Sequence, residues 1–193
     1  MYLIVGLGNP GEKYKNNRHN VGFQFIDYLI ENLQFPNPKF QKKLHSEIYQ
    51  LTINNQQLTL AKPQTFMNLS GQAVKQLSKV YGPKSNNLII VHDDLDIPLG
   101  KFKIQTGVGP RLHNGIESIE KTLKTKDFWR VRIGVDKRPA RNATHSVAGG
   151  KPESWTDGET YVLQNFKWKE KEVTNQTFSK IYDQLGTRFF TQD

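Results

Sequence analysis

The chain has 193 residues, a length that suits one folded domain without disulfide bonds or a structural metal. Its 27 lysines and arginines outnumber 18 acidic residues, and the net charge of +9 favours an anionic partner. It has no cysteine, which excludes a disulfide framework, a thiol nucleophile and a thiolate zinc site, and it has no apolar run long enough to span a membrane. We therefore expect a basic protein of a reducing compartment, the cytoplasm.

The first 38 residues predict a strand followed by a helix. The run Tyr2–Leu7 is almost entirely apolar and short, which is typical of a buried strand. Apolar residues then recur at helical spacing over Val21–Leu29. Asn20 is the predicted N-cap of this helix, and Pro36 and Pro38 are its predicted stop.

A hairpin and a second helix come next. Two strand-like segments, Ile48–Ile53 and Leu58–Leu60, flank Asn54-Asn55, a typical turn sequence. The amphipathic segment Ala73–Tyr81 predicts a helix that ends at Gly82-Pro83.

The second half continues the alternation. Leu88–Val91 predicts a buried strand that runs into the acidic cluster His92–Asp96, and Lys101–Gln105 alternates like an exposed strand. Apolar spacing over Ile116–Leu123 predicts a third helix, and Val131–Val135 predicts a further strand.

The chain ends with a predicted loop and helix. The segment Pro139–Gly158 is rich in Gly, Pro, Ser and Thr, which indicates a long loop, and Lys169–Phe190 has helical spacing. Buried strands that alternate with helices predict an α/β fold, and the hairpin makes the sheet mixed. No repeat or linker interrupts the chain, and the long loop is the only candidate boundary, so we expect a single domain over residues 1–193.

One glycine motif indicates a different function. Gly6–Gly11 matches G-x-G-x-x-G after a strand, the fingerprint of a nicotinamide oxidoreductase. That fingerprint needs a helix that starts on the loop and an acidic residue at the end of the second strand. Glu12–Arg18 has no apolar periodicity, and the next strand ends at Thr52–Asn54 without an acid. We therefore expect no nicotinamide cofactor.

His19 and Asp93 are candidates for acid–base chemistry. His19 lies at the start of a predicted helix, just beyond the carboxyl end of the first strand, where α/β sheets bind ligands. A helix N-terminus is expected to lower the pKa of His19 and keep the ring neutral. Asp93 ends another buried strand and can orient an imidazole from the same edge. A metal site or a solvated acidic loop are the alternatives for this cluster.

Three asparagines lie at junctions before helices: Asn9, Asn68 and Asn114. Their amide side chains can form hydrogen bonds to a carbonyl group and a water molecule of a reaction. Asparagine is also a good N-cap, so helix capping is the alternative role. The chain has no G-x-S-x-G elbow, and a water molecule activated by histidine is the simplest hydrolytic scheme.

Basic residues gather in Lys121–Arg141 and interleave there with Phe128 and Trp129. Lys101 and Lys103 lie on the preceding predicted strand. Such a run is either a solvated face or, with its aromatic residues, a phosphate-binding surface.

Six motifs, in this order and at this spacing over residues 1 to about 138, resemble those of bacterial-type peptidyl-tRNA hydrolases. They are Ile4–Gly11, Arg18–Gly22, Lys62–Gly71, Val91–Asp96, His113–Gly115 and Arg130–Val135. The resemblance implies a single α/β domain with a twisted mixed β-sheet flanked by α-helices. It also implies an enzyme that hydrolyses the ester between a peptide, or an N-blocked aminoacyl group, and the ribose of tRNA. We expect this enzyme to recycle tRNA as a monomer, without a metal or cofactor.

The resemblance also implies roles for single residues. His19 would be the general base that activates water, and Asp93 would hold and polarise the His19 imidazole. Asn9 would bind the peptide backbone, while Asn68 and Asn114 would position the substrate and stabilise the tetrahedral intermediate. The implied cleft residues are Tyr14, Phe66 and Met67, and the implied tRNA-phosphate contacts are Lys103, Arg132 and His113.

The loop before His113 departs from the family. Family members have two glycines directly before the histidine, whereas Gly107–Leu112 ends in Pro110, Arg111 and Leu112. We expect this loop to stand differently over the cleft. A relative that binds RNA without catalysis is therefore the alternative function. The Pro139–Gly158 segment is interpreted as an insertion.

Overall fold

The computed structural model describes residues 1–35, 39–53, 55–82, 85–138 and 156–190. The strands are β1 (Tyr2–Gly6), β2 (Lys39–Gln41), β3 (Ser46–Ile53), β4 (Gln56–Pro63), β5 (Leu88–Pro98), β6 (Phe102–Thr106) and β7 (Trp129–Asp136). In the described part they form one seven-stranded sheet in the order β2-β3-β4-β1-β5-β7-β6. Strands β4, β1, β5 and β7 are parallel, and β2, β3 and β6 add antiparallel edges. The predicted mixed α/β sheet is confirmed.

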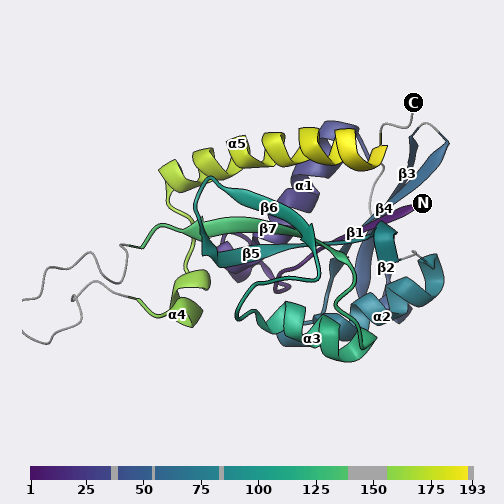
Figure 1. The fold of residues 1–193 in the computed structure, drawn as a ribbon, viewed down its shortest axis with the longest axis horizontal. Helices are drawn as coiled ribbons and strands as arrows, with labels where there is room; N and C mark the ends of the chain where they lie inside the picture. The colour runs from purple at the N-terminus through teal and green to yellow at the C-terminus, as the bar shows by residue number, and fades with distance from the viewer. Residues whose placement is uncertain (36–38, 54, 83–84, 139–155, 191–193) are drawn as a thin grey trace, which may run out of the picture.

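Helices cover both faces of the sheet (Figure 1). They are α1 (Val21–Leu33), α2 (Ser70–Tyr81), α3 (Asn114–Leu123), α4 (Gly158–Val162) and α5 (Trp168–Leu185). Helices α1 and α5 lie on one face, and α2 and α3 lie on the other (Figure 1). Within the described ranges, no helix combines the length and the apolar character needed to cross a membrane.

Strand alternation divides the core into two layers. Ile89 and Val91 of β5 pack with the α1 and α5 side chains, whereas Ile90 packs with those of α2 and α3. Because successive side chains of a strand point to opposite faces, this alternation also separates the polar residues that follow on β5.

The predicted hairpin and the second helix are confirmed. Strands β3 and β4 pair in antiparallel register, with Ile53 opposite Gln56. Helix α2 ends at Tyr81, followed by Gly82 in the left-handed conformation (φ 51°), which suits a residue without a side chain.

Two helix ends differ from prediction. Helix α1 ends at Leu33, because Gln34 adopts a left-handed conformation and closes the last turn; Pro36 and Pro38 lie outside the described residues. The last helix, α5, ends at Leu185 and continues as a π-helical turn, Gly186–Phe190.

Two further predictions, the long loop at Pro139–Gly158 and the alternatives for the acidic cluster, can be compared with the structure. Residues 139–155 of the loop are not described, and Gly158 already begins α4. The alternative of a solvated acidic loop is wrong, because β5 continues to Pro98 and pairs with β7 up to Asp94 and, after a register shift, again at Pro98. Asp93 and Asp94 are each only 2% exposed.

Close packing of two glycines places α1 against the sheet. A Cβ atom on Gly6 would lie 2.3 Å from the carbonyl oxygen of Gly22, and one on Gly22 would lie 2.4 Å from the carbonyl oxygen of Val91. Only glycine permits this approach. The first glycine of the G-x-G-x-x-G motif, Gly6, therefore allows α1 to pack closely against the sheet. Helix α1 begins at Val21 and not directly after the motif, which ends at Gly11. This packing holds the turn before α1 at the carboxyl ends of β1 and β5.

Candidate active site

An imidazole–carboxylate pair lies at that edge of the sheet. His19 belongs to the 3-10 turn Arg18–Asn20 that precedes α1, and Asp93 belongs to β5. The distance from His19 Nδ1 to Asp93 Oδ1 is 2.9 Å, and both side chains are buried. The predicted meeting of these two side chains at one edge agrees with the parallel pairing of β1 and β5.

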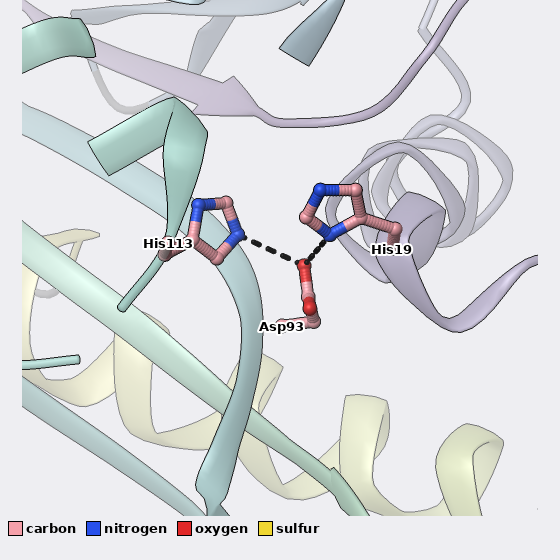
Figure 2. Close-up of side chains that lie close together, drawn as sticks. All are labelled: His19, Asp93 and His113. Atoms are coloured by element: carbon pink, nitrogen blue, oxygen red, sulfur yellow. Dashed lines mark hydrogen bonds and ion pairs between the residues drawn. The ribbon is translucent and has the colours of Figure 1, made fainter. Parts of the chain in front are cut away.

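A second imidazole reaches the same carboxylate oxygen (Figure 2). His113 Nε2 lies 2.9 Å from Asp93 Oδ1. His113 caps α3, and its Nδ1 accepts the backbone N–H groups of Gly115 at 3.1 Å and Ile116 at 3.3 Å. Because Nδ1 is an acceptor, the ring proton of His113 is on Nε2, which donates to Asp93. His113, and not Asn114, is therefore the capping residue of α3.

The same reasoning sets the tautomer of His19. An ionised carboxylate only accepts hydrogen bonds, so His19 Nδ1–H donates to Asp93. The Nε2 atom of His19, which points away from Asp93 in Figure 2, keeps its lone pair when the ring is neutral. A ring held in this way can accept a proton at Nε2.

The pKa of His19 differs from expectation. Burial by itself lowers this pKa, but the charge of Asp93 and its hydrogen bond outweigh burial and raise the pKa above the ordinary 6.5. The expected lowering by a helix N-terminus is therefore wrong. Burial alone would raise the pKa of the Asp93 carboxyl, but His19 and His113 hold that pKa far below its usual range.

Asn9 is held by three hydrogen bonds. Its backbone N–H donates to Asn20 Oδ1 and its carbonyl oxygen accepts from Asn20 Nδ2, both at 2.9 Å. Its own Oδ1 accepts the backbone N–H of Met67 at 2.9 Å. Asn20 precedes α1 as predicted, but its side chain forms hydrogen bonds to the Asn9 backbone and does not cap the helix. Asn9 Nδ2 has no acceptor among the described residues and remains available as a donor.

These groups line a cleft of about 770 Å³. The predicted site residues in its wall are Asn9, His19, Phe66, Met67, Asn68, Asp93, His113 and Asn114. Asn68 and Asn114 are exposed, and their side chains make no hydrogen bond to any described residue. Tyr14, in the turn Glu12–Tyr14, is not part of the wall.

The two residues predicted to bind phosphate have different surroundings. Arg132 is buried, and its Nε lies 2.6 Å from Asp94 Oδ2. Its guanidinium also lies against Gly109, where a Cβ atom would be 2.4 Å away. Lys103, on β6, is exposed. Only Lys103 of this pair therefore presents a solvated cation.

The divergent loop Gly107–Leu112 has several anchors. Arg130 Nη1 donates a hydrogen bond to the Gly109 carbonyl oxygen, and Gln105 Nε2 donates to the Val108 carbonyl oxygen at 2.9 Å. The backbone N–H of Arg111 donates to an Asp96 carboxylate oxygen at 3.1 Å. Held at these points, the loop brings Leu112 into the cleft wall.

His19, Asp93 and His113 are also a candidate metal site. Their ligand atoms all lie within 4.8 Å of one another, the one such cluster found in the described part of the chain. However, the hydrogen bonds to His113 Nδ1 leave the proton on Nε2, the atom that would have to bind the metal. The arrangement fits a hydrogen-bonded cluster better than a metal site.

Sequence reasoning missed the attachment of the C-terminal segment. Arg18, the neighbour of His19, forms a buried ion pair with Glu170 at 2.7 Å. It also donates to the carbonyl oxygens of Tyr161 and Gln164, both at 3.3 Å. These contacts hold Val162 and Leu163 in the cleft wall, and 152 positions separate Arg18 from Glu170. No sequence pattern around Arg18 or Glu170 indicates that these two residues form an ion pair.

Fold and site together define a class of protein. A carboxylate-bound imidazole whose second nitrogen has no partner among the described residues, set in a cleft at the carboxyl ends of parallel strands, is typical of α/β enzymes with acid–base chemistry. Comparison with known proteins makes the assignment specific. A family model described as peptidyl-tRNA hydrolase matches residues 3–192.

Individual relatives agree with the family model. A peptidyl-tRNA hydrolase of Lawsonia intracellularis is 39% identical over 191 residues, which covers 99% of this chain and 87% of the relative. One of Dehalococcoides mccartyi is 40% identical over 187 residues, which covers 96% and 92%. The crystal structure of a peptidyl-tRNA hydrolase from Acinetobacter baumannii matches with a TM-score of 0.78 at 32% identity, covering 93% of this chain and 83% of that one. The chain belongs to the peptidyl-tRNA hydrolase family.

Proposed function

We propose that this member of the family, an enzyme that hydrolyses the ester bond of peptidyl-tRNA, uses a water molecule activated by His19. One observation carries the proposal. Asp93 Oδ1 holds His19 by Nδ1, which leaves Nε2 as the proton acceptor on the cleft side.

The reaction needs one proton acceptor that later becomes a donor. His19 Nε2 takes a proton from water as the water oxygen attacks the ester carbonyl carbon. The tetrahedral intermediate then breaks its bond to the ribose oxygen, which takes that proton from His19. The products are the peptide acid and free tRNA. Asp93 orients the ring and stabilises the imidazolium that forms between the two steps.

Amide side chains supply hydrogen bonds without adding charge. Asn9 Nδ2 is the donor proposed for the peptide backbone, supported by the three hydrogen bonds that hold the rest of Asn9. Asn68 and Asn114 are proposed to position the substrate and stabilise the oxyanion of the intermediate. Their exposure in the cleft wall and their lack of partners in the described ranges support this role.

The phosphate contacts are reassigned in this proposal. His113 supports Asp93, because both of its ring nitrogens already have protein partners. Arg132 is paired with Asp94 and lies directly against Gly109, so its proposed role is to support the Gly107–Leu112 loop. Lys103 remains the proposed contact with a tRNA phosphate.

The overall charge agrees with a polyanionic substrate. A net charge of +9 favours tRNA by counterion release and by steering. The proposed working form is a monomer in the cytoplasm. Gel filtration of the free chain tests the monomer, and an elution volume of a dimer would contradict it.

The direct test measures release of free tRNA from N-acetylated aminoacyl-tRNA, with tRNA affinity measured in parallel. The wild type should release tRNA, and His19→Ala should lose activity by about 10²–10⁴-fold while it still binds tRNA. If the wild type and His19→Ala bind tRNA but are equally inert, the chain is an RNA-binding relative without catalysis. Equal activity of the two would exclude His19 as the base.

A further inference from the structure

Exposed apolar side chains gather at the cleft. Eight large hydrophobic side chains are exposed in the described part of the chain, and four of them line the cleft. These four are Phe66 (53% exposed), Leu69 (41%), Leu112 (91%) and Leu163 (44%). An exposed apolar cluster around a polar centre is typical of a binding site, since the protein gains nothing from leaving it in water.

Leu112 is the most exposed member, although its backbone is well anchored. The loop that carries it is tied to Arg130, Gln105 and Asp96 by hydrogen bonds. Leu112 also directly precedes His113, which contacts Asp93. The leucine is thus held at the cleft with almost no covering by the protein, so its apolar surface is available to a ligand.

The position of the ester limits which part of the substrate reaches this surface. In the proposed reaction, the carbonyl carbon lies one water molecule from His19 Nε2. The side chain of the esterified amino acid branches from the next carbon atom, so it must lie in the cleft as well. Leu69, Leu112 and Leu163 are aliphatic and suit an alkyl or benzyl group. Phe66 supplies a phenyl ring to the wall and suits stacking with a nucleobase.

We propose that Leu112, with Leu69 and Leu163, forms an apolar subsite for the side chain of the amino acid that is esterified to tRNA. The inference rests on the proposed function. It predicts faster hydrolysis of esters of apolar residues. Glu159, an exposed acid in the same wall, disfavours acidic side chains by charge repulsion.

The test uses a single tRNA acylated in turn with N-acetyl-leucine, N-acetyl-phenylalanine, N-acetyl-glycine and N-acetyl-aspartate. For the wild type, kcat/KM for the leucine and phenylalanine esters should exceed that for the glycine ester by about tenfold, and the aspartate ester should be slowest. Leu112→Ala should remove most of this advantage, because kcat/KM should fall more for the leucine and phenylalanine esters than for the glycine ester. Leu112→Met should retain it, because methionine keeps the apolar volume.

A matched control lies in the same loop. Val108 is 63% exposed but is not part of the cleft wall. Val108→Ala should therefore leave all four values of kcat/KM unchanged, and equal melting temperatures would show that both loop variants fold.

Three outcomes would overturn the subsite. An equal loss of kcat/KM for all four esters in Leu112→Ala would show that Leu112 contacts the tRNA and not the amino-acid side chain. No loss for any ester would show that Leu112 contacts neither the tRNA nor that side chain. A loss in Val108→Ala as large as in Leu112→Ala would attribute the effect to the loop backbone. Failure of the proposed function is distinct, since the wild type would then release tRNA from none of the four esters.

Discussion

His19 and His113 donate hydrogen bonds to the same atom, Oδ1 of Asp93, each at 2.9 Å. The two imidazoles differ in what holds their other nitrogen. Nδ1 of His113 is occupied by the first backbone N–H groups of α3, whereas Nε2 of His19, a residue of the cleft wall, has no hydrogen-bond partner among the described residues. One carboxylate is thus fixed by one ring and orients the other, which distinguishes a supporting histidine from a reactive one.

The first prediction concerns pH. His19 must be neutral to accept a proton, and Asp93 raises its pKa above 6.5. The value of kcat/KM should therefore rise with pH along a limb whose midpoint lies above 6.5. In Asp93→Asn the charge is lost and burial, which lowers the pKa, dominates, so the midpoint should move to lower pH while kcat falls by about a hundredfold or more.

The control for the pH profile removes a different charge from the cleft. Glu159→Gln changes an exposed acid that does not contact His19. The pH midpoint of kcat/KM in this variant should therefore match that of the wild type. A limb in Asp93→Asn at the wild-type position would show that Asp93 does not set the pKa of His19.

The second prediction separates two roles of His113. Asparagine also caps helices, so His113→Asn should keep α3 intact but lose the hydrogen bond to Asp93. A hydrogen bond to a charged group stabilises by about 1.5–3 kcal/mol, so kcat should fall by about tenfold or more at unchanged KM. The salt dependence of tRNA binding should not change. A raised KM with a weaker salt dependence would instead support contact with phosphate.

The third prediction compares Lys103→Ala with Arg132→Ala. Lys103 is exposed, so its loss should reduce the salt dependence of tRNA binding by about one phosphate contact without a change in stability. Arg132→Ala leaves the fully buried Asp94 carboxylate without its ion-pair partner and should cost about 3–5 kcal/mol of unfolding free energy. Salt titrations and urea denaturation measure the two effects. The reverse pattern would return Arg132 to the phosphate site.

The fourth prediction tests the packing of α1. In Gly22→Ala, the added Cβ would lie 2.4 Å from the carbonyl oxygen of Val91, so α1 must shift and carry His19 away from Asp93. We expect a loss of about 1–3 kcal/mol in unfolding free energy together with reduced kcat. Gly186→Ala is the control, because an added Cβ meets no atom of the described residues within 4 Å and should be neutral or slightly stabilising. Equal stability of the two variants would contradict a tight contact between α1 and the sheet.

The sequence by itself determined the elements of the fold and the location of the main pair. Apolar periodicity distinguishes strands such as Leu88–Val91 from helices such as Ala73–Tyr81, because burial on one face imposes a period of 2 or 3.6 residues. Parallel strands present their carboxyl ends at one edge, so His19 and Asp93 were predictable neighbours. These properties depend on local order along the chain.

Only the tertiary structure decided which partner each polar group has. His113 binds Asp93, Arg132 binds Asp94 and Asn20 grips Asn9. Each outcome depends on where strand pairing and helix packing bring distant side chains together. The pKa of His19 shows the physical reason: the helix terminus predicted a lowering, but a charge 2.9 Å away in space, 74 positions along the chain, raises it. Electrostatic interactions follow spatial distance, which the order of residues along the chain does not specify.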